Sequence, residues 1–290
     1  MTTTSKAKPT SKRLLSNMAL RWACLFPILA AFTAAQASTV GWYRMEGTAG
    51  DAISSVATSE GTAPTLTQSG ATFNYGSNVA GSQIYDPVSD TTYANTSSLE
   101  YTGNATTAYL QSADTVGGPF DVADFTIEMF VKVDTVVNNY RYFVDHDPTN
   151  AWGFRVLDND DNYKVGAVVD NGTLSGSGDA VDVADGLWHH MAIVVKSSDD
   201  GNNFSRFYFD YQLIRENTGL TYLNDYNPEV SAPFRIYAEE FSGYADEVRF
   251  SNSILSTDDF LVAIPEPGTF TLFGLGFIAI YLGIRRRSKK

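Results

Sequence analysis

The chain has 290 residues, with 33 acidic and 20 basic side chains and a formal net charge of −13 at pH 7. Five basic residues lie in residues 1–37 and five in residues 264–290, where Glu266 is the single acidic residue. Residues 38–263 therefore hold 10 basic and 32 acidic residues, a net charge near −22. This excess of negative charge excludes nucleic acids and anionic membranes as partners bound through charge.

The first 37 residues have the pattern of a secretory signal peptide. Residues 1–21 contain five basic side chains and no acidic one, and an apolar run follows from Trp22 to Phe32. Ala35-Gln36-Ala37 then forms a small-residue cleavage site. We predict cleavage after Ala37. This removes Cys24, the single cysteine of the chain, so we expect the exported chain to contain no disulfide.

Residues 38–263 are predicted to form one domain of short strands. Alternating apolar and polar segments are separated by turn-forming residues, and no segment shows a long 3.6-residue period. Residues 47–105 are rich in Thr, Ser and Gly, which predicts loops with a short strand at Thr65–Thr67. The pattern favours an all-β, antiparallel sandwich with one helical turn at 256–261. The other predicted strands span 39–46, 125–133, 140–145, 152–158, 163–170, 188–196, 204–210, 234–237 and 243–250.

Four segments resemble, in the right order, the LamG-like, concanavalin A-like jelly-roll domains. They are FTIEMFVK at 125–132, DGLWHHMA at 185–192, RFYFD at 206–210 and FSGYADEVRFSNSILS at 241–256. The resemblance implies an antiparallel two-sheet jelly roll over residues 38–263. Tyr211 departs from the family pattern, because it replaces the glycine that usually follows the hairpin aspartate. We therefore expect this hairpin to turn differently.

The predicted strand 125–133 is where hydrolases of the same superfamily carry their catalytic carboxylates. Those enzymes need two carboxylates that project from one face about 5.5 Å apart. This strand offers Glu128 alone, with Phe130 and Lys132 on the same face, while its other face is apolar. Asp246 and Glu247 are adjacent, so we expect them to point to opposite faces of their strand. No hydrolase pair is predicted, and Glu128, Phe130 and Lys132 become candidates for contact with a glycan.

The residues favour calcium over other metals. His189 and His190 are adjacent on a predicted strand, so they point in opposite directions and cannot chelate one ion together. Calcium prefers several carboxylate, amide and carbonyl oxygens. The resemblance implies a structural calcium between the end of the first strand and the last strand, with Glu46 and Asp246 as the matching ligands.

The end of the chain combines three signals in a fixed order. Pro265-Glu266-Pro267 stays extended and exposed because proline fixes φ and donates no backbone hydrogen bond. An uncharged segment at 268–284 would form a helix of about 25 Å, marginal for a bilayer core of ~30 Å. A basic cluster at 285–290 follows. These residues (264–290) resemble the PEP-CTERM sorting signal, whose partner is the membrane protease exosortase.

The resemblances together imply an exported protein. We expect it to be anchored in the inner membrane before the tail is processed, and then to lie at the cell surface or outside the cell. The leading function is a non-catalytic surface or matrix protein that binds glycan or another extracellular polymer through the LamG-like domain. The alternatives are a glycoside hydrolase of the same superfamily and a structural coat protein without a ligand.

Overall fold

A computed structural model describes twelve segments between Ser38 and Pro265. The predicted signal peptide, its cleavage site at Ala37, and the tail from Glu266 onward lie outside the described residues. In the part of the chain that is described, no helix is long and apolar enough to cross a membrane. The described segments are 38–70, 72–102, 108–113, 118–136, 142–146, 152–159, 162–169, 172–173, 181–197, 202–219, 233–237 and 241–265.

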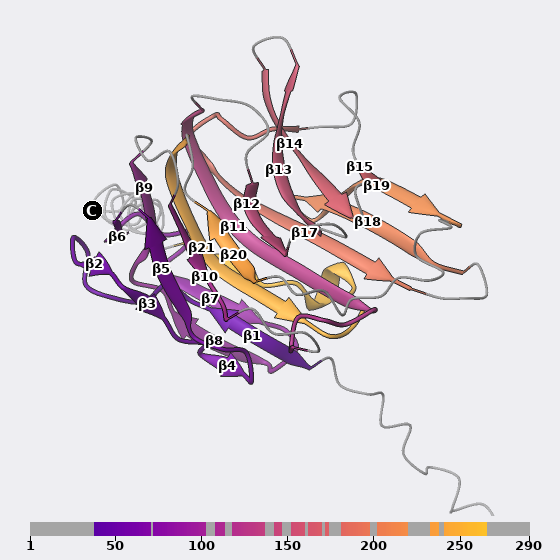
Figure 1. The fold of residues 1–290 in the computed structure, drawn as a ribbon, viewed down its shortest axis with the longest axis horizontal. Helices are drawn as coiled ribbons and strands as arrows, with labels where there is room; N and C mark the ends of the chain where they lie inside the picture. The colour runs from indigo at the N-terminus through magenta and orange to yellow at the C-terminus, as the bar shows by residue number, and fades with distance from the viewer. Residues whose placement is uncertain are drawn as a thin grey trace, which may run out of the picture. The chain divides into compact units, whose positions relative to one another are not determined.

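The described residues form two large antiparallel sheets that pack face to face (Figure 1). The first sheet is centred on the two longest strands, and the second sheet lies against its inner face. In order across the first sheet, the strands are β19 (Gln212–Thr218), β18 (Phe204–Phe209), β17 (Trp188–Lys196), β11 (Phe125–Val136), β21 (Phe241–Ser251), β9 (Ser98–Thr102), β6 (Phe73–Gly76) and β2 (Ala52–Ile53), with β1 (Thr39–Tyr43) on β21 and β4 (Glu60–Gly61) on β1.

The second sheet is built mainly from hairpins in the middle of the chain. Its strands in order are β15 (Gly172–Thr173), β14 (Asn162–Val169), β13 (Trp152–Asn159), β12 (Tyr142–His146), β20 (Phe234–Tyr237), β10 (Ala108–Gln111), β5 (Leu66–Gly70) and β3 (Ser55–Val56), with β16 (Val181–Asp182) on β14.

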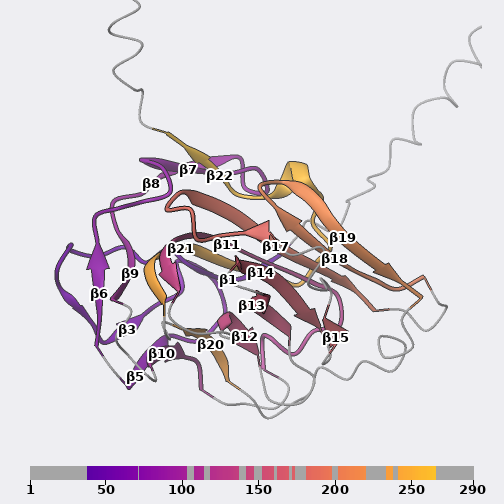
Figure 2. The ribbon, with the colours of Figure 1, turned by 90° about the horizontal axis from the view of Figure 1, so that it is seen from above.

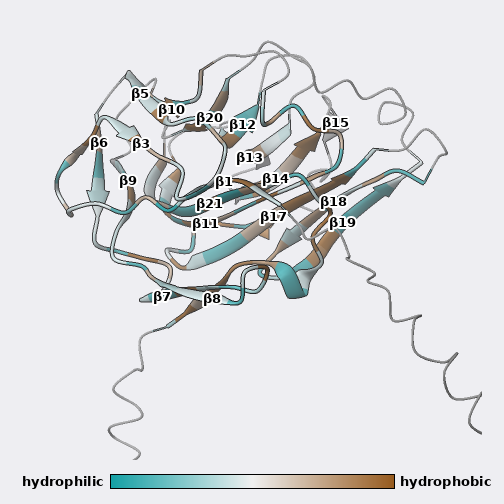
Figure 3. Cartoon of the chain, turned by 90° about the horizontal axis from the view of Figure 1, so that it is seen from below, coloured by the Kyte–Doolittle hydropathy of each residue, from teal (hydrophilic) through white to brown (hydrophobic). Residues whose placement is uncertain are grey.

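The main core fills the space between these two sheets. The alternation predicted for 125–133 is confirmed, since the inward side chains of β11 from Phe125 to Val133 are fully buried. Phe125 lies 5.1 Å from Trp152 of the opposite sheet, and Trp152 stacks on Phe250 at 5.2 Å, measured between ring centroids. Hydrophobic residues run along the strands of both sheets in Figure 3. Burial of such rings supplies most of the stabilisation, because large-to-small changes in a core cost about 3–5 kcal/mol each.

A smaller layer covers the outer face of the first sheet, and we call it the cap. It consists of the three-stranded sheet β22 (Val262–Ile264), β7 (Gln83–Asp86) and β8 (Thr91–Ala94), together with the 3-10 turn η2 (Thr257–Asp259). Figure 2 shows β7, β8 and β22 on the side of the first sheet that faces away from β12 and β20. A second apolar cluster joins cap and sheet through Trp42, Ile84, Phe130 and Leu261. Strand β11 is therefore buried on both faces.

The sandwich fold predicted from the sequence is confirmed, and β17 and β20 match their predicted bounds. The predicted helical turn corresponds to η2. The segment 47–105 differs from the prediction, because it contributes strands to both sheets and two strands to the cap.

The β18–β19 hairpin adopts the left-handed backbone conformation that glycine would adopt, contrary to the expectation that it would turn differently. Asp210 and Tyr211 both have positive φ, 47° and 64°. The turn is tight, with Phe209 paired to Gln212. Tyr211 can hold this backbone because its ring and hydroxyl are both fixed by neighbours, as described below.

Candidate functional site

Glu128 lies at the centre of a fully buried polar network between the first sheet and the cap. Its Oε1 accepts a hydrogen bond from Arg249 Nε at 2.7 Å, and its Oε2 accepts one from the backbone N of Leu261 at 2.9 Å. His190 Nε2 lies 2.8 Å from the same Oε2. Arg249 extends the network to Asp86 of β7, with Nη1 2.5 Å from Oδ1. These contacts fasten the cap to β11 and β21.

The surroundings of Glu128 favour the ionised form of its carboxyl group. Burial by itself raises its pKa, but the charge of Arg249 and the hydrogen bond from His190 outweigh burial and hold the pKa below its ordinary value. A general acid needs the opposite shift. Glu128 is also 0% exposed, so its carboxylate does not reach a polymer in this structure.

The three residues predicted to contact a glycan differ in how deeply they are buried. Phe130 is 3% exposed and packs beneath the cap with Ile84 and Leu261. Lys132 lies two residues further along β11, beyond the cap, and its side chain reaches solvent. Of these three residues, Lys132 has the most exposed side chain, at 17%.

Lys132 belongs to a row of side chains that crosses the first sheet beside the cap. It pairs in register with Trp188 of β17 on one side and with Tyr244 of β21 on the other. Lys132 Nζ lies 5.4 Å from the centre of the Tyr244 ring, and the Trp188 and Tyr244 rings are 6.3 Å apart. The next register partner is Glu100 of β9. This row combines flat rings, an ammonium group and a carboxylate on one half-buried surface.

A pocket with a volume of about 510 Å³ lies next to this row. Its walls are residues 77–82, from the loop that enters the cap, and Pro265, the first proline of the tail motif. Asn78 of the wall accepts a hydrogen bond from Trp188 Nε1 at 2.9 Å, which joins pocket and row. Ligand pockets in proteins commonly have volumes of ~300–1,000 Å³.

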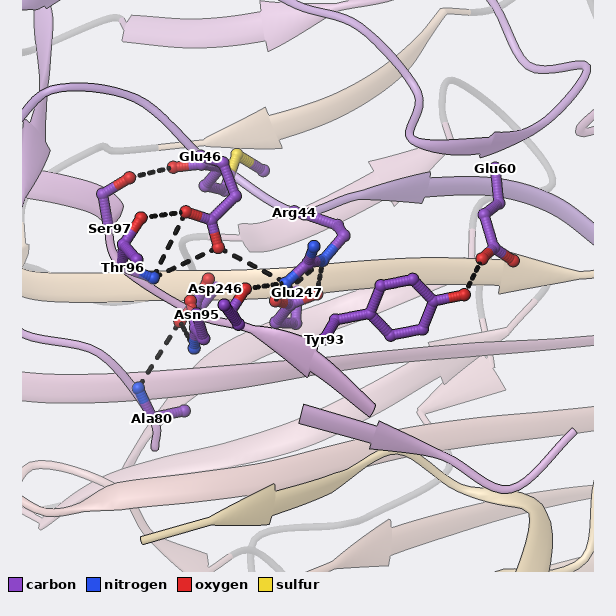
Figure 4. A network of polar contacts seen from close by, with 12 residues as sticks. Arg44, Glu46, Glu60, Ala80, Tyr93, Asn95, Thr96, Ser97, Asp246 and Glu247 are labelled. Carbon is purple, nitrogen blue, oxygen red and sulfur yellow. Dashed lines mark hydrogen bonds and ion pairs between the residues drawn. The ribbon is translucent and has the colours of Figure 1, made fainter. Parts of the chain in front are cut away.

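A second polar network lies behind the same loop and is drawn in Figure 4. Asp246 Oδ2 accepts hydrogen bonds from Asn95 Nδ2 at 2.8 Å and from Ala80 N at 3.4 Å. Glu247 pairs with Arg44, whose Nη2 lies 3.1 Å from Oε1. The pKa of Asp246 is raised because the residue is buried and lies close to the charge of Glu247. Burial likewise raises the pKa of Glu247, against the opposing effect of Arg44.

The expectation that Asp246 and Glu247 point to opposite faces is wrong. Glu247 has a φ of 52°, and the register between β11 and β21 shifts at this point, which marks a β-bulge. Val248 takes the inward position that strict alternation would give to Glu247. Both carboxylates therefore belong to the network beside the cap, and both are 0% exposed.

The predicted metal ligands lie at two points of this network. The carboxylate of Glu46 already has protein partners, since it accepts hydrogen bonds from Thr96 N at 3.2 Å and contacts Arg44. Asp246 Oδ1 and Asn95 Oδ1 are buried and have no hydrogen-bond partner among the described residues. Those residues contain no group of three or more His, Cys, Asp or Glu side chains arranged to hold a metal.

The two histidines serve different partners, as their adjacent positions predicted. His190 joins the Glu128 network, whereas His189 lies between two aspartates and stacks on Phe209. His189 Nδ1 is 2.9 Å from Asp210 and Nε2 is 3.0 Å from Asp185. Both aspartates come from loops, so His189 clamps the start of β17 to the β18–β19 turn.

Two family models match this chain. One, described as the concanavalin A-like lectin/glucanases superfamily, matches residues 103–259, more than half of the chain. The other, described as the PEP-CTERM protein-sorting motif, matches residues 263–287 and indicates an exported protein. A search of curated protein sequences finds no match.

Three solved structures with a similar fold are distant in sequence from this chain. Domain 4 of an extracellular GH43 arabinanase from Geobacillus stearothermophilus, in complex with arabinotriose, is 16% identical, with 77% of this chain and 97% of that chain covered and a TM-score of 0.48. A heptameric pentraxin from Limulus polyphemus is 14% identical (62% and 80% covered, TM-score 0.40). A Trypanosoma rangeli sialidase is 12% identical (77% and 32% covered, TM-score 0.46).

Proposed function

Because this chain belongs to the concanavalin A-like lectin/glucanases superfamily and carries a PEP-CTERM sorting motif, we propose that it is a non-catalytic surface protein that binds glycan. Exosortase would process the tail, with residues 268–284 as the membrane anchor before processing and the cell surface as the destination. The binding site would be the row Trp188, Lys132 and Tyr244 together with the adjacent pocket.

The observation that carries this proposal is the register of the row. Three strands bring an indole, an ammonium and a phenol side by side, although these residues are more than 50 positions apart in the sequence. Aromatic rings offer flat apolar surface to a sugar ring, and their polar ends can bond hydroxyl groups. Asn78, Glu100 and Asp134 add hydrogen-bonding groups around the rings.

A hydrolase remains the alternative, and the described carboxylates argue against the positions that the sequence suggested. Glu128, Asp246 and Glu247 are all 0% exposed. Because of this burial, none of the three carboxylates faces solvent as a nucleophile or a general acid. Arginines also bind Glu128 and Glu247.

We propose also that a calcium ion stabilises the network around Asp246. The support is the pair of buried oxygens on Asp246 and Asn95 that no described residue satisfies, because buried polar atoms usually have a partner. Carboxylate and amide oxygens are suitable ligands, and backbone carbonyls or water would have to complete the shell. Asn95 replaces Glu46 as the neighbouring ligand in this proposal, since Glu46 is already engaged.

A glycan array tests the binding proposal. Full-length protein purified in detergent should bind a subset of glycans, and Tyr244→Ala or Trp188→Ala should weaken binding about tenfold, equivalent to ~1.4 kcal/mol. Tyr85→Ala, on the cap, is the matched control because it removes a solvent-facing tyrosine outside the row. Thermal unfolding of each variant separates lost binding from lost folding. Unchanged binding by both row variants would refute the site.

A further inference from the structure

The outer face of the second sheet carries a cluster of tyrosines and arginines, which we call the Tyr–Arg face. It lies on the side of the sandwich opposite to the cap (Figure 2). Alternate residues of neighbouring strands β13, β12, β20 and β10 point outward from this sheet and are half-buried. They are Arg155, Tyr142, Arg235, Tyr237 and Tyr109.

The rings and guanidinium groups of this face form one connected surface. Tyr237 is in register with Tyr109, at a ring-centroid distance of 5.9 Å, and lies 6.3 Å from Tyr142. Arg235 lies 5.2 Å from the centre of the Tyr109 ring, and Arg155 lies 5.9 Å from that of Tyr142. Three strand spacings of ~4.8 Å separate β13 from β10, so the surface extends roughly 14 Å across the sheet.

Hydrogen bonds hold the centre of this face in place. Arg235 Nη1 donates to the hydroxyl of Tyr237 at 3.1 Å, and that hydroxyl donates to Asp145 Oδ2 at 3.0 Å. Asp145 is 2% exposed. Asp145 is therefore covered by its neighbours and bonded to Tyr237, whereas Arg155 and Arg235 are half-buried.

The two arginines of the Tyr–Arg face outnumber the carboxylate of Asp145, which pairs in register with Arg235, whereas acidic residues dominate the domain as a whole. Residues 38–263 contain 10 basic residues against 32 acidic ones, and two of the ten lie in this one cluster. At physiological salt the Debye length is about 8 Å. The electrostatic potential at this face therefore depends mainly on nearby charges such as the two arginines, and little on the acidic residues elsewhere. The local charge favours an anionic ligand.

We propose that the Tyr–Arg face is a second binding surface, for an acidic polysaccharide whose sugar rings carry carboxylates. Guanidinium groups bind carboxylates through two parallel hydrogen bonds, which an ammonium cannot reproduce. The tyrosines between the arginines offer flat apolar surface to the sugar rings.

This inference goes beyond the proposed function, because the two surfaces lie on opposite sides of the sandwich. One molecule could hold a glycan beside the cap and an acidic chain on the second sheet at the same time. Such a protein would cross-link two polymers of an extracellular matrix, and its overall attachment would gain from both contacts.

Binding of full-length protein to polygalacturonate, measured by calorimetry in detergent, tests the proposal. Wild type should bind, with affinity falling as salt is raised, and the double variant Arg155→Gln/Arg235→Gln should bind at least tenfold more weakly. Arg206→Gln/Arg215→Gln removes the same charge from β18 and β19 and should bind like wild type. Tyr109→Ala, which keeps both arginines, should weaken binding several-fold.

Three results would overturn the proposal. They are no binding by wild type, equal binding by the Arg155/Arg235 double variant, and equal binding of poly-glutamate, which would point to an acidic protein partner. Trp188→Ala should still bind polygalacturonate. The two surfaces can thus fail independently, since loss of glycan-array binding in that variant concerns the row alone.

Discussion

The ring of Tyr211 stacks on the ring of His190, with centroids 4.6 Å apart and an angle of 4° between the planes. The Tyr211 hydroxyl also donates a hydrogen bond to the carbonyl of Leu261 at 3.0 Å. The β18–β19 turn is thereby joined to the cap. These contacts compensate for a left-handed backbone that costs a non-glycine residue about 1–2 kcal/mol.

Replacing Tyr211 with glycine should destabilise the protein, although glycine suits the turn. The substitution relieves the backbone cost but loses a stacked pair worth ~0.5–1.5 kcal/mol, a hydrogen bond of similar value and the buried ring area. We expect the free energy of unfolding to fall by about 1–2 kcal/mol in urea titrations. Tyr211→Phe keeps the ring and should cost about 1 kcal/mol. A more stable Tyr211→Gly would mean that backbone strain outweighs the cap contacts.

The clamp around His189 predicts a pH-dependent stability. Burial lowers the pKa of His189, but the hydrogen bonds that its ring donates to Asp210 and Asp185 outweigh burial and raise the pKa above its ordinary value. A raised pKa in the folded state stabilises the protein fully below the unfolded value of ~6.5, and this contribution is lost as pH rises through the folded pKa. Thermal midpoints measured from pH 5.5 to 8.5 should therefore fall more in wild type than in His189→Gln. Parallel curves would show that the pKa of His189 is the same in the folded and unfolded states.

The calcium proposal predicts a midpoint that depends on divalent cations. A ligand that binds only the folded state stabilises by about 2.7 kcal/mol at a hundredfold excess over Kd. EDTA should lower the thermal midpoint of wild type, and added CaCl2 should restore it. Asp246→Ala should remove this response, whereas Asp182→Ala, on an exposed strand of the second sheet, should keep it. No effect of EDTA at neutral pH would leave Asp246 as a residue that only bonds Asn95 and Ala80.

The sequence predicts well the elements whose signal is local. The apolar alternation from Phe125 to Val133 identifies β11 and its inner face, and the Trp-His-His segment identifies β17. Strand β7 has no such signal, because Ile84 is its one buried apolar residue and its buried Asp86 is ion-paired with the distant Arg249. The two residues of this pair are 163 positions apart, so the sequence around Asp86 does not predict the cap.

The candidate site depends even more on long-range register. Lys132 was identified because of its strand, but Trp188 and Tyr244 join it only through pairing with β17 and β21. The bulge at Glu247 also depends on pairing, because the register with β11 shows that Ala245 and Val248, three residues apart, both point inward. Two periods of alternation are too short to reveal such a shift.

The tail should be removed from the protein at the cell surface. Strand β22 pairs with β7 up to Ile264, so the sorting motif begins directly at the edge of the cap. We expect intact-mass measurement of surface-exposed protein to lack residues 270–290. Glu266→Ala should leave unprocessed protein in the inner membrane, whereas Asp258→Ala in the exposed turn η2 should be processed normally. Detection of Lys290 on the surface-exposed protein would contradict exosortase processing.

Glu128 should matter for folding and not for catalysis. Its carboxylate neutralises Arg249 in a fully buried network, and removal of one partner of such a pair costs about 3–5 kcal/mol. Glu128→Gln keeps the shape of the side chain but loses its charge, so we expect a drop of about 3 kcal/mol in the free energy of unfolding. Because the pKa of Glu128 is lowered, its stabilising effect should be present at neutral pH and be lost as pH falls through the folded value.

The same variant decides between binding and hydrolysis. Wild-type protein incubated with β-glucans, galactans and the exopolysaccharide of its own cells should release no reducing ends, because Glu128 lies beneath the cap and is 0% exposed. Glu100→Gln, which changes an acid of the solvent-facing row, serves as the matched comparison, and neither variant should alter the result. Release of oligosaccharides by wild type that disappears in Glu128→Gln, measured below its unfolding temperature, would establish a hydrolase whose cap opens.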